Sequence, residues 1–387
     1  MLQSFFFYTF IAVLLYLLSK FIVIREQVEI TSRNHKQISF WSPEIVISII
    51  LFASFAGLRY NVGVDYPVYL SEYIRLQESL PTLRETFEIG FYFISKILAE
   101  SRVHFFFYFS LWGGVQIFFI YYAFRYKKYL LPYISLFIIL GPFFLDWMNG
   151  IRQTVVSCLF VFLIEFIEKR KLIKYCIGII IGSLFHKTAI LLLPFYFILN
   201  KPYKLGEKRW VTISIFMVCI ILGLSPTWLS ITNQLEFIFT FLGYDFYAES
   251  LENFAEESSR EVAWGPSRIG DLLIAISILI YYPQMKAYYK DKLLPFYFIL
   301  YFIGICWYNL FVNTSHIYLR PSMYFIIFKL PLTAYLLFYL KQNKLYFNFF
   351  ALACIAFSYI YFVVYKIGVS SQYPEYSLYK FFFDYIE

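Results

Sequence analysis

Four short polar segments interrupt the long apolar stretches of this chain, and they hold the residues best suited to chemistry. They are AGLRYNVGVDYPVY (56–69), DWMNGIRQT (146–154), FHK (185–187) and NTSHIYLRP (313–321). Three segments carry an arginine near the end of an apolar stretch: Arg59, Arg152 and Arg320. A guanidinium group can bind phosphate oxygens through two parallel hydrogen bonds, so the three are candidates for a diphosphate-binding site. The alternative is that each arginine only extends to lipid headgroups.

His186 and Asp65 are the candidates for proton transfer. An imidazole titrates near neutrality and suits a general base, and a carboxylate is the second choice. Ionisable residues within membrane segments are costly and tend to be functional, although His186 can also be a hydrogen-bonded residue that fills a gap between helices. Side chains next to these candidates in the sequence are expected to support them: Tyr66, Tyr69, Gln153 and His316. Lys329 lies deep in an apolar stretch, where it could line a cavity, extend to lipid headgroups or form a buried ion pair.

The composition places these residues in a membrane. Of 387 residues, 60% are hydrophobic and 15% charged, and the mean hydropathy is +0.64. Apolar stretches of about 20 residues recur along the chain, which indicates an all-α polytopic membrane protein. The alternation typical of a transmembrane barrel is absent. Most basic residues sit in short loops between spans, so the net charge of +8 reflects orientation and not nucleic-acid binding.

The apolar stretches predict about 11–12 spans. Ten of them are expected at 4–24, 40–58, 104–124, 130–146, 151–167, 209–230, 269–287, 293–312, 320–340 and 345–366. The stretch 172–200 has basic residues at both ends and His186 in the middle. Because basic loops stay on the cytoplasmic side, this stretch is predicted to form two short legs that meet near His186 at the outer face. The alternative is one long tilted helix.

This arrangement gives one consistent orientation, with the N-terminus outside. The predicted inner loops hold 20 of the 33 basic residues; they are 20–39, 125–129, 168–174, 201–209, 286–292 and 341–344. The chain is expected to be a single membrane domain, 1–387, with two larger outer loops. One is 59–103, which includes a short amphipathic helix at 87–103. The other is the acidic loop 231–268, either a solvated face or a lid over substrate.

The sequence offers no resident metal or disulfide framework. The five cysteines are scattered inside apolar stretches, without a Cys-x-x-Cys pair or a Cys/His cluster. The seven carboxylates of the loop 231–268 lack a regular ligand spacing. We therefore expect no metal and no cofactor.

Four motifs in order resemble a known family. GLRYNVGVDYPVY, FEIGF, NGIRQTVV and SLFHKTAILLLPFYF, within residues 45–200, are similar to the EpsG-type polysaccharide polymerases, relatives of the Wzy O-antigen polymerases. The likeness continues more loosely through SHIYLRPSMYF. It implies an architecture related to the O-antigen ligases and C-type glycosyltransferases.

The resemblance also implies an activity and a location. Such enzymes lie in the bacterial cytoplasmic membrane and use undecaprenyl-diphosphate-linked oligosaccharides as donor and acceptor on the periplasmic or extracellular side. The growing chain leaves its lipid diphosphate and joins the non-reducing end of a new repeat unit, without metal or nucleotide, and often with a separate chain-length regulator. The residues carried over by the resemblance are Arg59, Asp65, Tyr66, Arg152, Gln153 and His186, with Arg320 matching less closely.

Two other classes compete with a polymerase. A flippase or transporter of lipid-linked oligosaccharide would share the aromatic residues and arginines, but would place charges along a path across the membrane. A membrane acyltransferase would also use histidine, yet the His-Asp pattern expected for it is not evident around His186. Direct displacement by a polymerase would invert the anomeric centre of the donor sugar.

Overall fold

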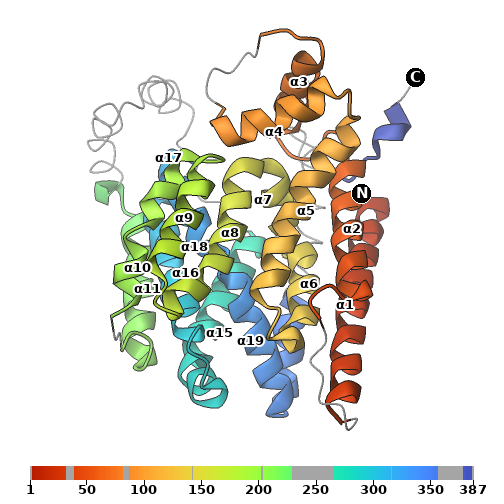
Figure 1. The fold of residues 1–387 in the computed structure, drawn as a ribbon. Coiled ribbons are helices and arrows are strands. Elements are labelled where there is room, and N and C mark those ends of the chain that lie inside the picture. The colour runs from red at the N-terminus through yellow and green to blue at the C-terminus, as the bar shows by residue number, and fades with distance from the viewer. Residues whose placement is uncertain are drawn as a thin grey trace. The chain divides into compact units, whose positions relative to one another are not determined.

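The chain folds into helices, as a computed structural model shows (Figure 1). The structure describes residues 2–31, 39–81, 87–141, 143–201, 204–228, 265–314, 316–355 and 378–385. Within these ranges there is no β-strand, and one isolated bridge pairs Arg59 with Phe381. Two compact units are formed, the first by 1–200 with 333–387 and the second by 201–332.

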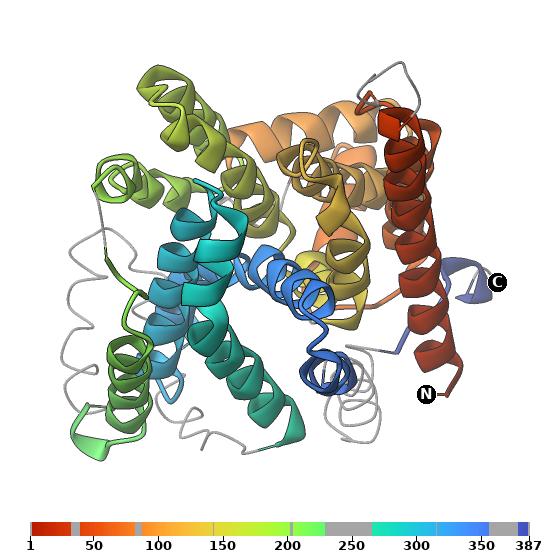
Figure 2. The ribbon, with the colours of Figure 1, turned by 90° about the horizontal axis from the view of Figure 1, so that it is seen from below.

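Six helices form the body of the first unit. They are α1 (Leu2–Thr31), α2 (Pro43–Leu58), α5 (Phe105–Ala123), α6 (Leu131–Leu140), α7 (Phe143–Asn149) and α8 (Ile151–Glu168). The most extensive packing joins α2 to α5, α1 to α6 and α5 to α8. Prolines in the first turn start α2 and α6, where the missing N–H has no helical partner to lose. Figure 2 shows α1 and α2 side by side.

Small residues allow α2 and α5 to approach closely. A Cβ atom on Gly57 would overlap Ser110 Oγ and the carbonyl oxygen of Phe106, and one on Gly113 would lie 2.5 Å from Ala56 Cβ. Close backbone approach of this kind is typical of helix pairs in membranes. It fixes the end of α2, and therefore Arg59, against α5.

Two short helices lie outside the body of this unit. They are α3 (Tyr66–Gln77) and α4 (Ile89–Glu100), above α5 and α7 in Figure 1. Their inner faces pack around aromatic rings; Tyr73 stacks on Tyr108 with ring centroids 4.2 Å apart, and Phe91 stacks on Trp112 at 4.7 Å. The segment 87–103, expected to be helical, contains α4.

The stretch 172–200 forms two legs, as predicted. The first leg is α9 (Leu172–Ser183), and the second contains η2 (Lys187–Leu192) and α10 (Phe195–Leu199). The Tyr175 hydroxyl donates to the Leu192 carbonyl at 2.6 Å, and Arg170 Nη2 donates to the Asn200 carbonyl at 3.3 Å. The two ends of the stretch therefore lie together, with His186 at the turn. A single long tilted helix is excluded.

Ion pairs gather at the opposite end of the first unit from this turn. Arg25 pairs with Glu44 at 2.8 Å and Lys128 with Glu26 at 3.0 Å. Arg125 pairs with Glu165, which also binds Lys169. These contacts bring segments from the predicted inner loops 20–39, 125–129 and 168–174 to one end of the unit, as the charge distribution required.

The second unit is built around α16. Its helices are α11 (Arg209–Gly223), α15 (Pro266–Tyr289), α16 (Leu294–Phe311), α17 (His316–Leu319) and α18 (Met323–Ile326), with the 3-10 turn η3 (Arg320–Ser322). Both α11 and α18 pack on α16. The helix α19 (Lys329–Gln342) begins in this unit and ends in the first.

The prediction of an all-α polytopic membrane protein is confirmed. Four helical segments among the described residues are long and apolar enough to cross a membrane: Leu2–Val28, Phe105–Ala123, Leu294–Phe311 and Arg320–Gln342. A fifth candidate is the pair Lys128–Leu140 and Phe143–Asn149, bent by 62°, and shorter apolar helices accompany them. Most of the acidic loop 231–268 lies outside the described residues.

We expect Gly57→Ala to destabilise the first unit, because its methyl group would meet the backbone of Phe106. Overpacking of this kind costs about 1–3 kcal/mol. The measurement is the apparent melting temperature of purified protein in detergent. Gly114→Ala is the control, since its Cβ would make an ordinary 3.5 Å contact with Ala53 Cβ. Equal melting temperatures for the two variants would contradict the packing of α2 on α5.

Candidate active site

A buried carboxylate, Glu88, joins two of the predicted functional residues. Its Oε2 accepts a hydrogen bond from Arg152 Nη1, and its Oε1 lies 3.1 Å from His186 Nδ1. Oε1 also accepts the backbone N–H of Lys187 at 3.2 Å. Glu88 is 6% exposed. One carboxylate thus links α8 to the turn between α9 and η2.

The three side chains come from the ends of three elements. Glu88 is the residue before α4, Arg152 is the second residue of α8, and His186 precedes η2. Gln116 of α5 steadies the start of α8, since its Nε2 donates to the Trp147 carbonyl at 3.1 Å and to Thr154 Oγ1 at 2.9 Å. The site is therefore attached to helices and not to an isolated loop.

Gly90 allows α4 to reach the turn that carries His186. Its N–H donates to the Leu184 carbonyl at 2.8 Å, and a Cβ here would lie 2.9 Å from both Leu184 Cβ and Leu184 O. A larger residue would push α4 away from the turn. The glycine of FEIGF thus keeps Glu88 within reach of His186.

Aromatic rings surround the Arg152 guanidinium. Its Cζ lies 5.0 Å from the ring centre of Phe87 and 6.0 Å from that of Phe91. The Tyr69 side chain forms a hydrogen bond with Arg152. Cation–π contacts of this kind favour a charged guanidinium in a partly dry site. The arginine is held on one side by Glu88 and on the others by rings.

Glu88 remains ionised in this site. Burial raises the pKa of its carboxyl, but the hydrogen bond from His186 and the charge of Arg152 outweigh burial and lower the pKa from 4.5 to about 2. For Tyr69, burial raises the pKa of the phenol, and the neighbouring Arg152 only partly offsets it. The site therefore presents one carboxylate, one guanidinium, one imidazole and a neutral phenol at working pH.

The carboxylate also selects a form of the histidine. An ionised carboxylate can accept hydrogen bonds but cannot donate one. Nδ1 of His186 therefore carries the hydrogen and donates it in the hydrogen bond to Glu88. In the neutral imidazole the lone pair is then on Nε2. A carboxylate placed in this way fixes the orientation of the ring and faces the imidazolium once it forms. The pair is arranged to accept a proton at Nε2.

Arg59 lies in a separate environment on the same aromatic cluster. It is fully buried, its Nε donates to the Ala56 carbonyl at 3.1 Å, and its Nη1 donates to the Val62 carbonyl. Its Cζ lies 4.9 Å from the ring centre of Tyr66 and 4.7 Å from that of Phe109. The guanidinium faces main-chain oxygens and rings, with Tyr66 itself 1% exposed.

A C-terminal segment, 378–385, helps to bury Arg59. The backbone N–H of Tyr60 donates to the Lys380 carbonyl at 2.8 Å, and the Tyr379 hydroxyl donates to the Phe55 carbonyl at 2.5 Å. Binding of a diphosphate by Arg59 would require this covering to move, so that role stays a prediction.

The segment around Asp65 packs against the end of α7, just before α8 begins. Its backbone N–H donates to Asn149 Oδ1 at 3.0 Å. Gln153, in the first turn of α8, is buried. The first unit thus assembles three of the four predicted polar segments, with Glu88 bridging the second and third. Asp65 as an alternative base stays a prediction.

The fourth polar segment belongs to the second unit. Arg320 lies in η3 with an exposed side chain, and His316 begins α17. The role of Arg320 and His316 in the site stays a prediction. Within the second unit, Lys329 forms an ion pair with Asp271, which favours the buried-pair interpretation for Lys329.

Sequence reasoning missed Glu88. The candidates predicted from the sequence are polar residues at span ends, and Glu88 appears there only within the FEIGF motif. Its partners are 64 and 98 residues away. A usable signal existed in the sequence: a carboxylate at the start of a short helix, within the same predicted outer loop as Arg59. Among the described residues no group of three or more His, Cys, Asp or Glu could hold a metal ion, so no metal ligand can be named.

The low pKa of Glu88 predicts acid-dependent stability. A folded-state pKa below the ordinary value adds stability above pH 4.5, and this contribution is lost as the pH falls towards 2. We expect the melting temperature of the wild type to drop over this interval, and Glu88→Gln to start lower and show a flatter profile. Glu100→Gln, which alters an exposed carboxylate, serves as the control. A Glu88→Gln profile parallel to the wild type would contradict the assignment.

Comparison with known proteins gives one result. A family model described as the EpsG family matches residues 45–381. No significant match was found among curated proteins or solved structures. The matched region contains all four polar segments as well as Glu88 and the C-terminal residues beside Arg59. It spans well over half of the sequence, and the chain therefore belongs to the EpsG family.

Proposed function

We propose that this chain is a polysaccharide polymerase, of the O-antigen type or similar, that joins oligosaccharide repeat units carried on undecaprenyl diphosphate. The observation that carries the proposal is the cluster of Glu88, Arg152 and His186. It combines a base and a phosphate-binding cation at one end of a helical membrane unit. Membership of the EpsG family supports the same class of reaction.

The base acts on the acceptor sugar. His186 Nε2 takes the proton from the acceptor hydroxyl as the hydroxyl oxygen attacks the anomeric carbon of the donor. Glu88, which stays ionised, stabilises the imidazolium that results. The bond between the anomeric carbon and the phosphate oxygen breaks, and the electron pair leaves with the lipid diphosphate. A single displacement of this kind inverts the anomeric centre.

Arg152 acts on the leaving group. Its guanidinium has five N–H donors, more than a single carboxylate can accept, and it is held in a partly dry aromatic setting. Fixed positive charge in such a setting stabilises developing negative charge strongly. Arginine can therefore supply what departure of a diphosphate needs without a metal ion. Arg59 and Arg320 are further candidates for the same diphosphate.

The donor and acceptor meet the protein on the outer face of a bacterial cytoplasmic membrane. The basic-loop distribution supports this side, because the ion-paired end of the first unit carries the loops predicted to lie inside. A separate chain-length regulator is the proposed partner of such an enzyme.

A flippase or transporter of lipid-linked oligosaccharide is the second candidate. It needs charged groups along a path through the membrane. In the first unit, four basic residues at the far end are paired with Glu26, Glu44 and Glu165, while the base and Arg152 lie together at the other end. This separation favours chemistry at one face.

Removing the site should abolish polymer growth. We expect Arg152→Ala, His186→Ala and Glu88→Gln each to reduce product at least a hundredfold, since each removes a charge or proton acceptor used in the transition state. The assay supplies a synthetic lipid-linked repeat unit to purified protein in vesicles and separates products by length. The wild type should give a ladder and release lipid diphosphate.

Arg75→Ala is the matched control, because this outer arginine donates only to the nearby Pro81 carbonyl at 2.8 Å among the contacts described. It should keep the ladder. Relocation of the substrate across the vesicle without any lengthening would identify a flippase instead. Ladders from both Arg152→Ala and His186→Ala would refute the proposed site.

The proposed orientation can be tested by labelling. In a Cys354→Ser background, which removes the exposed native thiol, we expect Lys187→Cys to react with a membrane-impermeant maleimide applied to intact cells. Lys171→Cys, exposed at the other end of the α9 leg, should react only after permeabilisation. The reverse pattern would place the cluster around Glu88 in the cytoplasm.

A further inference from the structure

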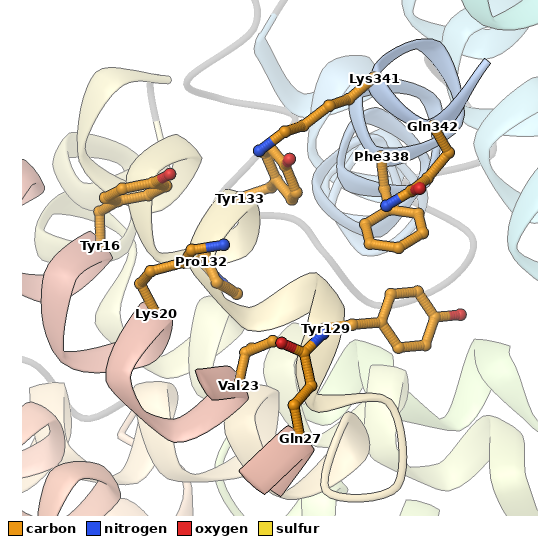
Figure 3. Close-up of a pocket in the computed structure, with 10 residues that line it drawn as sticks. All are labelled: Tyr16, Lys20, Val23, Gln27, Tyr129, Pro132, Tyr133, Phe338, Lys341 and Gln342. Atoms are coloured by element: carbon orange, nitrogen blue, oxygen red, sulfur yellow. The ribbon is translucent and has the colours of Figure 1, made fainter. Parts of the chain in front are cut away.

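A basic cavity lies at the end of the first unit that is remote from Glu88. It has a volume of about 110 Å³, and Figure 3 shows it between α1, α6 and the end of α19. Ten side chains line it: Tyr16, Lys20, Val23, Gln27, Tyr129, Pro132, Tyr133, Phe338, Lys341 and Gln342. The lining contains two lysines and no carboxylate.

The position of the cavity along α1 places it on the opposite side of the membrane from Arg59. Ser4, near the start of α1, accepts the Tyr379 N–H at 3.0 Å, and Tyr379 also contacts the end of α2. Lys20 and Gln27 follow Ser4 by 16 and 23 residues. At 1.5 Å per residue this is about 24–35 Å, close to the thickness of a hydrocarbon core. The cavity is therefore at the level of lipid headgroups.

The two lysines differ from three buried or half-buried basic residues at this end. Arg25, Lys128 and Arg125 each pair with a glutamate. Neither Lys20 nor Lys341 has a carboxylate partner among the described residues, and in Figure 3 both side chains extend into the cavity, one from α1 and one from α19. The ammonium groups of Lys20 and Lys341 repel each other within this cavity unless an anion lies between them.

The size and lining of the cavity suit a phosphate group. A cavity of about 110 Å³ has room for several water molecules, and therefore for the oxygens of a phosphate group. Tyrosine hydroxyls and the amides of Gln27 and Gln342 provide additional hydrogen-bond donors in the wall.

Apolar surface for acyl chains adjoins the cavity. Tyr133 of its wall lies 6.5 Å from Phe349, measured between ring centroids. Phe349 belongs to the apolar helix Tyr346–Ile355, on which Phe347 is 85% and Phe350 62% exposed. Phe21, which follows Lys20 in α1, is 58% exposed. A free anion would make no use of this surface, whereas a lipid would.

We propose that this cavity binds the phosphate headgroup of an anionic phospholipid from the inner leaflet. Basic pockets between membrane helices on the cytoplasmic side bind such headgroups. The lipid neutralises Lys20 and Lys341 and ties α19 to α1 and α6. This site is independent of the polymerase reaction proposed above and lies at the opposite end of the unit.

The test is lipid binding to purified full-length protein in a neutral detergent, measured by native mass spectrometry and by the rise in melting temperature. We expect phosphatidylglycerol to bind the wild type and phosphatidylcholine not to compete. Lys20→Gln/Lys341→Gln should weaken binding about thirtyfold, and each single variant about fivefold. Lys171→Gln/Lys174→Gln, which removes two exposed lysines of another inner loop, should bind within twofold of the wild type.

Three results would overturn the proposal. The first is unchanged phosphatidylglycerol binding in the double variant. The second is an equal loss of binding in the Lys171→Gln/Lys174→Gln control. The third is a melting-temperature rise with millimolar inorganic phosphate that equals the rise with lipid, which would identify a site for free anions. The single variants keep the test decisive if the double variant does not fold, and all of these readouts are independent of polymer synthesis.

Discussion

The buried carboxylate of Glu88 is the interaction on which the first unit depends. A charge removed from water must be compensated by partners, and here the partners are a guanidinium from α8, an imidazole from the turn after α9 and a backbone N–H. Three segments that are far apart in the sequence must therefore converge on the start of α4. Gly90 permits the close approach, and Gln116 holds the start of α8 in place. Loss of any partner would leave a charge buried and uncompensated, so fold and site are coupled at this point.

The two ends of the first unit use charge differently. At the end near Glu88, one carboxylate is shared between a cation and a base, in surroundings rich in aromatic rings. At the other end, Arg25, Arg125, Lys128 and Lys169 are neutralised by glutamates, whereas the two lysines of the cavity have no carboxylate partner among the described residues. Paired charges anchor helices at an interface, whereas charges without a protein counter-ion select an anionic ligand. The same physical rule thus supports a substrate site at one face and a lipid site at the other.

The helices and the two-legged stretch at 172–200 could be predicted because their signals are local. The length of an apolar stretch predicts a span. The stretch 172–200 has basic residues at both ends, which predicts that both ends lie on the same side of the membrane. The hydrogen bond between Arg170 and Asn200 agrees with this prediction. The pairing of Glu88 with Arg152 and His186 could not be predicted, since it depends on how distant segments pack. The burial of Arg59 is a similar case: its cover comes from Tyr379 and Lys380, more than 300 residues later. The sequence shows which charged residues lie near the end of a span, but it does not show whether their side chains are accessible to a ligand.

The charge balance of the cluster around Glu88 explains why a carboxylate belongs beside an arginine that is proposed to bind diphosphate. Before reaction, Glu88 neutralises Arg152 in a site where a lone guanidinium would be costly. When a diphosphate arrives, the additional N–H donors of Arg152 can bind it without release of Glu88. Proton transfer to His186 then creates a second cation as the leaving group gains negative charge. Glu88 faces that new imidazolium and Arg152 faces the phosphate, so each developing charge has an opposite charge already in place. Such preorganisation requires no rearrangement of solvent at the moment of reaction.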